Sequence, residues 1–274
     1  MTRRLFAGAL MAIALAVPLA FAASAQAQAP ASPAEAPVDA HPWDAAVTVL
    51  KATQADLPTG GIAAIRAHIP DLERVLADAP QSYGPAATVG DVRYVLVDGP
   101  TEALAAMAAA AADKSPAPVA RRTVAVANPY PAISFLLGTY YNETGKAHEA
   151  LRVLNIGLSL SAVKGASLGQ TLPILLSEKG TAYVVLKRWP DSLAAYEEGL
   201  KLPGLQDRDR ARLLRGRGFA LTELGRLDEA ETAYQDSLTS EPGNARALTE
   251  LNYIRRVRAG GPRTATEITT NPKQ

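Results

Sequence analysis

The densest group of side chains suited to binding chemistry is a cluster of five arginines within ten residues: Arg208, Arg210, Arg212, Arg215 and Arg217. Guanidinium groups bind carboxylates through paired, charge-assisted hydrogen bonds. We therefore predict that Arg212 and Arg215 bind an acidic segment of a partner. The alternative is a solvated arginine surface whose charges pair with the neighbouring Asp207 and Asp209.

Residues suited to catalysis are sparse. Ser161 and Lys164 have the Ser-x-x-Lys spacing of penicillin-binding enzymes, but no Lys-Thr-Gly motif accompanies them, so we interpret them as an exposed loop. The chain has no cysteine, which excludes disulfides, thiolate metal sites and a cysteine nucleophile. His41, His68 and His148 are far apart and lack metal-ligand spacing. We predict no catalytic residue, no metal site and no cofactor.

Composition points to a helical protein without a nucleic-acid partner. The chain has 274 residues, enough for one or two domains, and its net charge is +1. This charge gives no reason to expect nucleic acid as a ligand. Aromatic residues make up only 5% of the chain and alanine is abundant, which favours helices packed through small and aliphatic side chains.

The first 27 residues resemble a secretory signal peptide. Arg3 and Arg4 precede an apolar stretch from residue 5 to residue 23, and small residues such as Ala25 and Ala27 then offer cleavage sites. The arginine pair also fits a twin-arginine export signal, and a retained membrane anchor is the alternative. We predict a protein exported to a bacterial periplasm or secreted, with no membrane insertion after cleavage and with a flexible tether over residues 28–42.

Residues 43–127 are predicted to form a small helical or α/β region. A helix is expected over 43–56, and a second over 62–79 with a kink or a restart at Pro70. A further helix from residue 101 to residue 112 lies between two β-favouring segments, 92–97 and 123–127. These segments are either strands of a small α/β element or extended linkers.

The second half of the chain contains three copies of one pattern. Each copy has a glycine, a larger residue 3 positions later, a small residue 12 positions later and a second larger residue 16 positions later. A glycine opposite a small residue lets two helices cross closely, and the larger residues fill the space beside the crossing. The pattern comprises Gly138, Tyr141, Ala150 and Leu154, then Gly180, Tyr183, Ser192 and Tyr196, then Gly218, Leu221, Ala230 and Tyr234, followed by Pro242.

This pattern resembles the tetratricopeptide repeat (TPR), a helix-turn-helix unit of about 34 residues. The resemblance covers residues 131–258 and implies a mainly α fold, a TPR-like α-solenoid that binds another protein. Gly145 and Gly225 are expected to end the first helix of their repeats, where the middle copy has Lys187 instead. The predicted parts are repeats 131–164, 173–206 and 211–244, a capping helix 245–258 and a disordered tail 259–274.

The resemblance also implies which residues line the groove of the solenoid. Chaperone-binding members of the family clamp a terminal carboxylate there with asparagine and lysine side chains, but this chain has Thr139 and Ser177 at two of the places where that set is needed. We therefore predict a partner-binding set that includes residues of all three repeats. These residues are Arg212, Arg215, Phe219, Asn142, Phe135 and Thr181.

The function predicted from the sequence is non-catalytic binding of a protein or peptide partner, as a scaffold of the bacterial envelope. One alternative is an enzyme with its chemistry in residues 43–127 and the repeats as a docking arm. A second alternative is binding of a cell-wall glycan, for which Trp43, Tyr83 and Tyr94 are the stacking rings.

Overall fold

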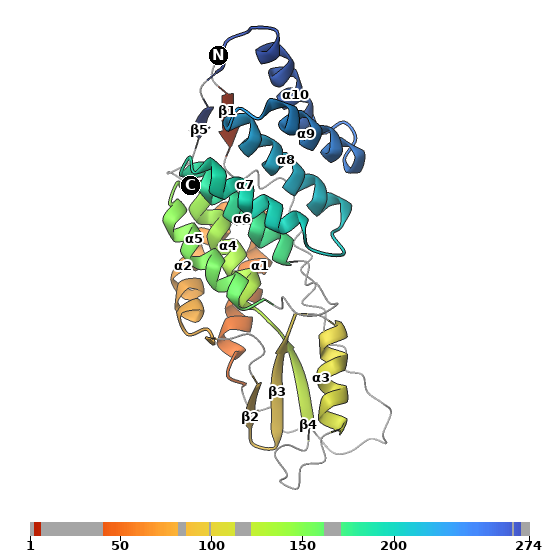
Figure 1. The fold of residues 1–274 in the computed structure, drawn as a ribbon. Coiled ribbons are helices and arrows are strands. Elements are labelled where there is room, and N and C mark those ends of the chain that lie inside the picture. The colour runs from red at the N-terminus through yellow and green to blue at the C-terminus, as the bar shows by residue number, and fades with distance from the viewer. Residues whose placement is uncertain are drawn as a thin grey trace.

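The computed structural model of the chain is a stack of helical hairpins with a small sheet at one end (Figure 1). It describes residues 3–6, 41–81, 86–98, 100–112, 122–161, 171–264 and 266–269. The helices are α1 (Asp44–Gly60), α2 (Ile62–Ala77), α3 (Pro100–Ala112), α4 (Tyr130–Glu143), α5 (Ala147–Ser159), α6 (Thr171–Val185), α7 (Trp189–Leu200), α8 (Asp207–Glu223), α9 (Leu227–Ser240) and α10 (Ala245–Arg258). The strands are β1 (Arg3–Phe6), β2 (Ala86–Val89), β3 (Val92–Val97), β4 (Arg122–Ala127) and β5 (Thr266–Thr269).

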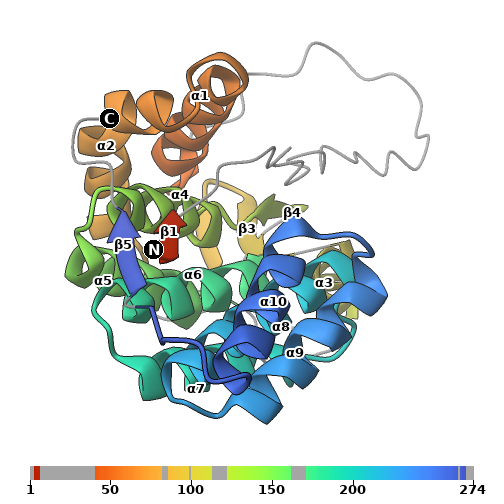
Figure 2. The same ribbon diagram turned by 90° about the horizontal axis from the view of Figure 1, so that it is seen from above.

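The three predicted repeats are three helical hairpins: α4 with α5, α6 with α7, and α8 with α9. The first helix of each hairpin packs on the first helix of the next, so α4, α6 and α8 follow one another through the stack (Figures 1 and 2). The second helix of each hairpin also packs on the first helix of the next. This arrangement confirms the predicted α-solenoid of helix-turn-helix repeats.

The stack extends further toward the N-terminus than the sequence pattern. Helices α1 and α2 form a hairpin of their own, and α2 packs along α4 as α5 packs along α6. Glu73 of α2 accepts hydrogen bonds from Tyr141 of α4 at 2.7 Å and from Arg152 of α5 at 2.6 Å. Residues 43–127 are therefore not one separate region. Helices α1 and α2 pack on the repeat helices and extend the solenoid. The glycine pattern of the repeats does not identify this hairpin. Helices α1 and α2 are joined by Gly61 alone, a shorter turn than those of the three repeats.

A small α/β unit is inserted between α2 and α4. The sheet order is β2-β3-β4, with β2 antiparallel and β4 parallel to β3, and α3 connects the two parallel strands. The two β-favouring segments of the sequence are thus paired strands and not linkers. Pro70 lies inside α2, which runs from Ile62 to Ala77 without a restart.

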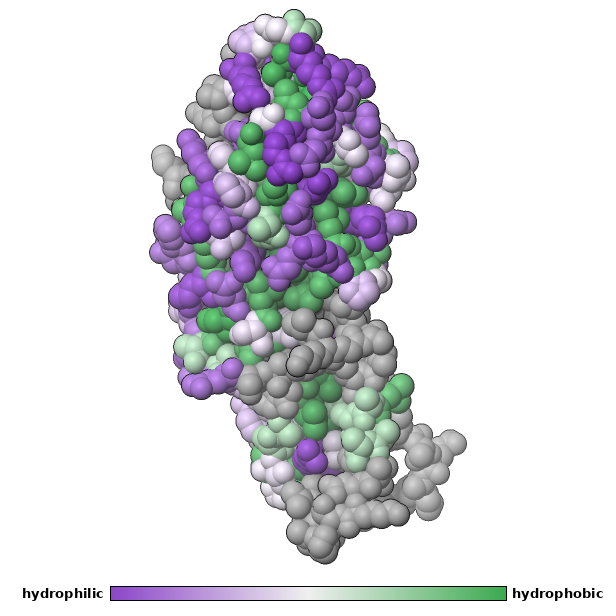
Figure 3. Space-filling view, in the orientation of Figure 1, coloured by the Kyte–Doolittle hydropathy of each residue, from purple (hydrophilic) through white to green (hydrophobic). Residues whose placement is uncertain are grey.

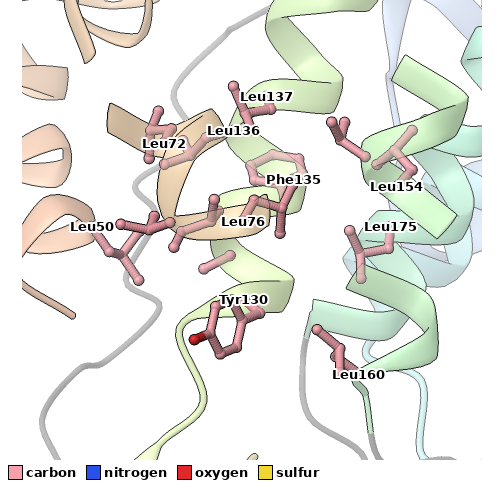
Figure 4. Packing of buried hydrophobic residues seen from close by; sticks show 14 of the residues in the cluster. Leu50, Leu72, Leu76, Tyr130, Phe135, Leu136, Leu137, Leu154, Leu160 and Leu175 are labelled. Atoms are coloured by element: carbon pink, nitrogen blue, oxygen red, sulfur yellow. The ribbon is translucent and has the colours of Figure 1, made fainter. Parts of the chain in front are cut away.

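The largest hydrophobic core surrounds α4. Every residue of α4 from Tyr130 to Asn142 is buried, because α2 packs on one side of it and α5 and α6 pack on the other. In Figure 4, Leu72 of α2 lies beside Leu136, whereas Leu154 of α5 and Leu175 of α6 lie on the opposite side of α4. A helix that is apolar around its whole circumference is expected to be enclosed in this way.

The turns inside the three hairpins share one left-handed backbone conformation. Gly145 and Gly225 have φ values of 76° and 80°, the left-handed conformation expected of glycines that end a helix. Lys187 adopts the same conformation with a φ of 56° and is the one residue other than glycine with a positive φ among the described residues. The middle turn therefore has the geometry of the other two, at the cost of a strained lysine.

The segment after α10 differs from the predicted disordered tail. The backbone N–H of Thr264 donates to the Tyr253 hydroxyl at 3.3 Å, and the Arg263 guanidinium lies beside Gly225. Thr266–Thr269 then forms β5, which pairs in parallel with β1. The tail contains β-branched residues at alternating positions, which favour strand pairing. Most of the predicted signal peptide, the tether and the last residues of the chain lie outside the described residues.

Candidate functional site

The atoms nearest to the three repeat glycines belong to the larger residues 16 positions later. A Cβ atom on Gly138 would lie 2.6 Å from Leu154 Cδ2, and one on Gly180 would lie 2.6 Å from Tyr196 Cε1. On Gly218 it would lie 2.9 Å from Tyr234 Cε2. A glycine is therefore required because an apolar side chain of the second helix occupies the space where its Cβ would stand.

The small residues 12 positions after the glycines lie fully buried at the same crossings. Ala150, Ser192 and Ala230 have no exposed surface. Ser192 also donates its hydroxyl to the carbonyl of Gly180 at 3.0 Å, so this position meets the backbone of the first helix. The sequence pattern thus identified the right pairs of helices, and the structure adds the larger residue 16 positions later as the side chain that fills the space beside each glycine.

Tyr196 occupies a slot between two of the first helices. Its ring lies against Gly180 of α6 on one side and against Gly216 of α8 on the other, and a Cβ on either glycine would overlap it. The hydroxyl of Tyr196 lies 3.4 Å from that of Thr181, and burial raises the tyrosine pKa to about 12. Gly216 was missed in the sequence because it lies outside the repeat pattern, two positions before Gly218.

Polar side chains connect the first helices of the first two repeats, and a charge on the first helix of the third repeat acts on them. The side-chain amide of Asn142 on α4 donates to the backbone carbonyl and to Oε2 of Glu178 on α6, at 3.0 Å in both cases. Burial raises the pKa of Glu178, while the Asn142 hydrogen bond and the charge of Arg212 on α8 lower it. Glu178 was not predicted, although one carboxylate among the apolar residues of α6 is a signal that could have identified it.

Several polar atoms of α4 beside Glu178 have no hydrogen-bond partner among the described residues. They are Thr139 Oγ1, Asn142 Oδ1 and Glu143 Oε1, each of which is buried. Burial and the nearby charge of Glu178 raise the pKa of Glu143 to about 7. We call Thr139, Asn142, Glu143 and Glu178 the acidic cluster.

The arginines of α8 are engaged by carboxylates of the chain itself. Arg215 donates to Glu241 at 2.5 Å and is largely buried, and Arg217 lies 3.3 Å from Glu197 of α7 and 3.9 Å from Glu229 of α9. The predicted alternative of pairing with Asp207 and Asp209 therefore names the wrong partners for these two side chains, since their carboxylates come from other elements. Arg212 is half-buried and acts electrostatically on Glu178 and Asp209.

The predicted partner-binding residues do not form one open surface. Phe135 is 2% exposed and packs in the core around α4, and Asn142 is 0% exposed with its side-chain amide on Glu178 of α6. Phe219 is buried and packs edge-on against Trp189 at a centroid distance of 6.0 Å. Thr181 and Arg212 remain half-exposed. Figure 3 shows mainly hydrophilic residues over α8, α9 and α10, with apolar residues between them.

The residues considered for other functions lie in structural roles. Ser161 donates its hydroxyl to the Gly157 carbonyl at 2.8 Å and is buried, and Lys164 lies outside the described residues. Trp43 and Tyr94 are 6% and 1% exposed and both contact His41, so they do not form a stacking platform; Tyr83 lies outside the described residues. This corrects the glycan-binding interpretation.

The remaining histidines pair with carboxylates or face solvent. His68 lies 2.8 Å from Asp56, which links α2 to α1, and His148 is exposed. Within the described part of the chain, no group of three or more histidine, cysteine or acidic side chains is placed to hold a metal ion. None of the described helices is long and apolar enough to cross a membrane.

Comparisons with known proteins give similarity at the level of structure. No protein-family model matches the chain, and the search of curated proteins finds no match. Among solved structures, the first TPR of Spaghetti (RPAP3) bound to HSP90 peptide SRMEEVD is 25% identical, with a TM-score of 0.41, over 47% of this chain and 94% of that one. The second TPR domain of human RPAP3, in complex with HSP70 peptide SGPTIEEVD, is 26% identical with a TM-score of 0.37, over 46% and 98%.

The family resemblance of the fold rests on this chain's own geometry. Three hairpins in succession share the left-handed turn, the glycine filled by a side chain 16 positions later, and the packing of first helix on first helix. The terminal helix α10 packs on α9 and closes the stack. The helices from Tyr130 to Arg258 therefore form a TPR-like α-solenoid.

Proposed function

We propose that the chain is a protein-interaction module that binds a segment of a partner along α6 and α8, beside their contact with the buried helix α4. The observation that carries this proposal is the acidic cluster. Buried polar groups are ordinarily hydrogen-bonded, and each one left without a partner destabilises the fold by about 1–3 kcal/mol. We take three such atoms within five residues of one helix as groups that a ligand would satisfy.

The neighbouring residues supply the rest of a binding surface. Arg212 and Thr181 are half-exposed beside the cluster, on the two helices that follow α4 in the stack. Tyr196 fixes the distance between these helices because its ring fills the slot between Gly180 and Gly216. A rigid scaffold of this kind binds with little loss of conformational entropy.

The test is affinity capture with the full chain and two matched variants. Arg212→Ala removes a half-exposed guanidinium beside the cluster, whereas Arg210→Ala removes an exposed one from the same helix. We expect one set of partner proteins to bind the wild type and Arg210→Ala and to be lost with Arg212→Ala. Equal capture by all three proteins would contradict the proposed surface, provided that their melting temperatures agree.

We also propose that the protein is exported and acts in the periplasm or outside the cell. The support is the sequence of the first 27 residues, with its arginine pair, apolar stretch and small residues at Ala25 and Ala27. The mature protein then lacks β1, so β5 loses its pairing partner. Intact-mass analysis of the protein from an envelope fraction tests this, because retention of residue 1 in that fraction would contradict the cleavage.

A further inference from the structure

The unpaired atoms of the acidic cluster face the same neighbour. Thr139, Asn142 and Glu143 are spaced i, i+3 and i+4, so they lie on one face of α4. This face is directed at α6, because the Asn142 amide donates to Glu178. The cluster therefore combines two carboxylates, an amide oxygen and a hydroxyl at the contact of the two helices.

Thr139 departs from the behaviour of the other threonines in these helices. Thr181 and Thr222 donate their hydroxyls to the carbonyl four residues earlier, at 3.1 Å and 2.8 Å, and Thr144 does so at 2.9 Å. Thr139 makes no such bond, and its buried Oγ1 has no hydrogen-bond partner among the described residues. Its side chain is only 3% exposed, so solvent does not replace the missing contact.

The unpaired atoms of the acidic cluster can accept hydrogen bonds, but no described residue donates one to them. Asn142 uses its amide N–H groups on Glu178, and its Oδ1 and Glu143 Oε1 are acceptors without a donor. Among the residues that the structure describes, Arg212 of α8 is the cation that acts on Glu178, and the charge that acts on Glu143 is the like charge of Glu178. Tyr196 of α7 faces Glu178 as well and is neutral at physiological pH.

We propose that the acidic cluster is an ammonium-binding subsite that receives a lysine side chain of the partner segment. A lysine ammonium has three N–H donors and no acceptor, which matches Thr139 Oγ1, Asn142 Oδ1 and Glu143 Oε1 in number and kind. This inference rests on the proposed function. It adds a cationic group to the partner segment that Arg212 contacts, whereas Arg215 and Arg217 are already paired with carboxylates.

Binding at this subsite depends on pH with a definite sign. Because the pKa of Glu143 is raised to about 7, its carboxyl is ionised above neutrality and neutral in mild acid. An ammonium ion is held more tightly by the ionised form. We therefore expect at least three-fold weaker binding at about pH 5.5 than at about pH 8.

The experiment is a titration of the full chain with n-butylammonium chloride, followed by the NMR signals of the Asn142 side-chain amide. We expect a saturable shift, and at least ten-fold weaker binding in Glu143→Gln. Thr139→Val, which removes Oγ1 at nearly constant volume, is expected to weaken binding about three-fold. Glu198→Gln, an exposed carboxylate of α7, serves as the matched control and retains wild-type affinity.

Tetramethylammonium chloride at equal ionic strength distinguishes hydrogen bonding from simple charge attraction, because it carries no N–H donor. An equal response to both salts, or an affinity within two-fold of wild type in both Glu143→Gln and Thr139→Val, would overturn the subsite. Failure here, with partner capture still lost in Arg212→Ala, removes the subsite and leaves the proposed function. If butylammonium binds as expected but partner capture does not depend on Arg212, the subsite stands and the proposed function is contradicted.

Discussion

Asn142 on α4 and Glu178 on α6 are joined by two hydrogen bonds from one amide group, to the backbone carbonyl and to the carboxylate, each 3.0 Å long. The pair is buried, and it holds the carboxylate at the point where the first two repeats meet. This contact converts a seam between two apolar helices into a polar site, since it places Glu178 beside Glu143 and within the influence of Arg212.

The first prediction concerns the carboxyl of Glu143. Its pKa in the folded chain is about 7, above the ordinary 4.5, so the folded state holds a proton that the unfolded state releases between these values. Stability is therefore greatest at the acid end of this window and falls as the pH rises through 7. Because the group is only partly buried, we expect this loss to be about 1 kcal/mol.

Urea unfolding of Glu143→Gln and wild type at about pH 5 and about pH 8 measures this effect. The variant is expected to lose less stability than wild type across the window. The exposed Glu198→Gln should behave like wild type, and the same pH dependence in all three chains would show that another group is responsible.

The second prediction concerns the slot around Tyr196. Gly180→Ala places a methyl group against the ring, and the ring has no room to retreat because Gly216 lies behind it. We expect a net destabilisation of about 1–3 kcal/mol despite the higher helix propensity of alanine. In a Tyr196→Leu background the same substitution should cost much less, so a double-mutant cycle measured by denaturant unfolding identifies the contact.

The third prediction concerns the middle turn. Lys187→Gly is expected to stabilise the chain by about 1 kcal/mol, because glycine adopts a φ of 56° without a clash. Gly145→Ala and Gly225→Ala, at φ values of 76° and 80°, should destabilise it by a similar amount. A loss of stability in Lys187→Gly would mean that the lysine side chain makes a compensating contact.

The fourth prediction concerns the attachment of the N-terminal hairpin. Glu73 of α2 accepts from Tyr141 and Arg152, so Glu73→Ala should destabilise the chain by about 1–3 kcal/mol and increase hydrogen exchange in α1 and α2. Asp71→Ala is the matched control, because Asp71 pairs with the exposed Arg74 of its own helix. An equal effect of both substitutions would contradict a specific role for Glu73.

The sequence predicted the repeats because their spacing reflects local constraints. A glycine, its partner 16 positions later and a turn residue all act within one hairpin, so Gly180, Tyr196 and Lys187 can be identified along a single stretch of chain. The capping helix was predicted to the residue, since Asn244 begins it with a side-chain cap and its apolar residues keep one period. Arg258 at the end of this helix pairs with Asp228 and Glu231 of α9.

Contacts between segments that are far apart in the chain could not be predicted from the sequence. The hairpin of α1 and α2 joins the solenoid through Glu73 and the apolar residues around Leu72, and none of these belongs to the repeat pattern. The acidic cluster was missed for the same reason, because Glu143 and Glu178 are 35 positions apart and each alone is an ordinary helix carboxylate. The enclosure of α4 as a whole depends on α2, whose packing along α4 is not part of the repeat pattern.

The most direct test of the binding surface is photo-crosslinking from two positions on the full chain. A benzoylphenylalanine at Thr181, half-exposed on α6 beside the slot, is compared with one at Thr239, exposed on α9. The account predicts that the Thr181 probe crosslinks a partner through a lysine-containing segment and that the Thr239 probe does not. Crosslinking from Thr239 alone, or equal crosslinking from both positions, would contradict it.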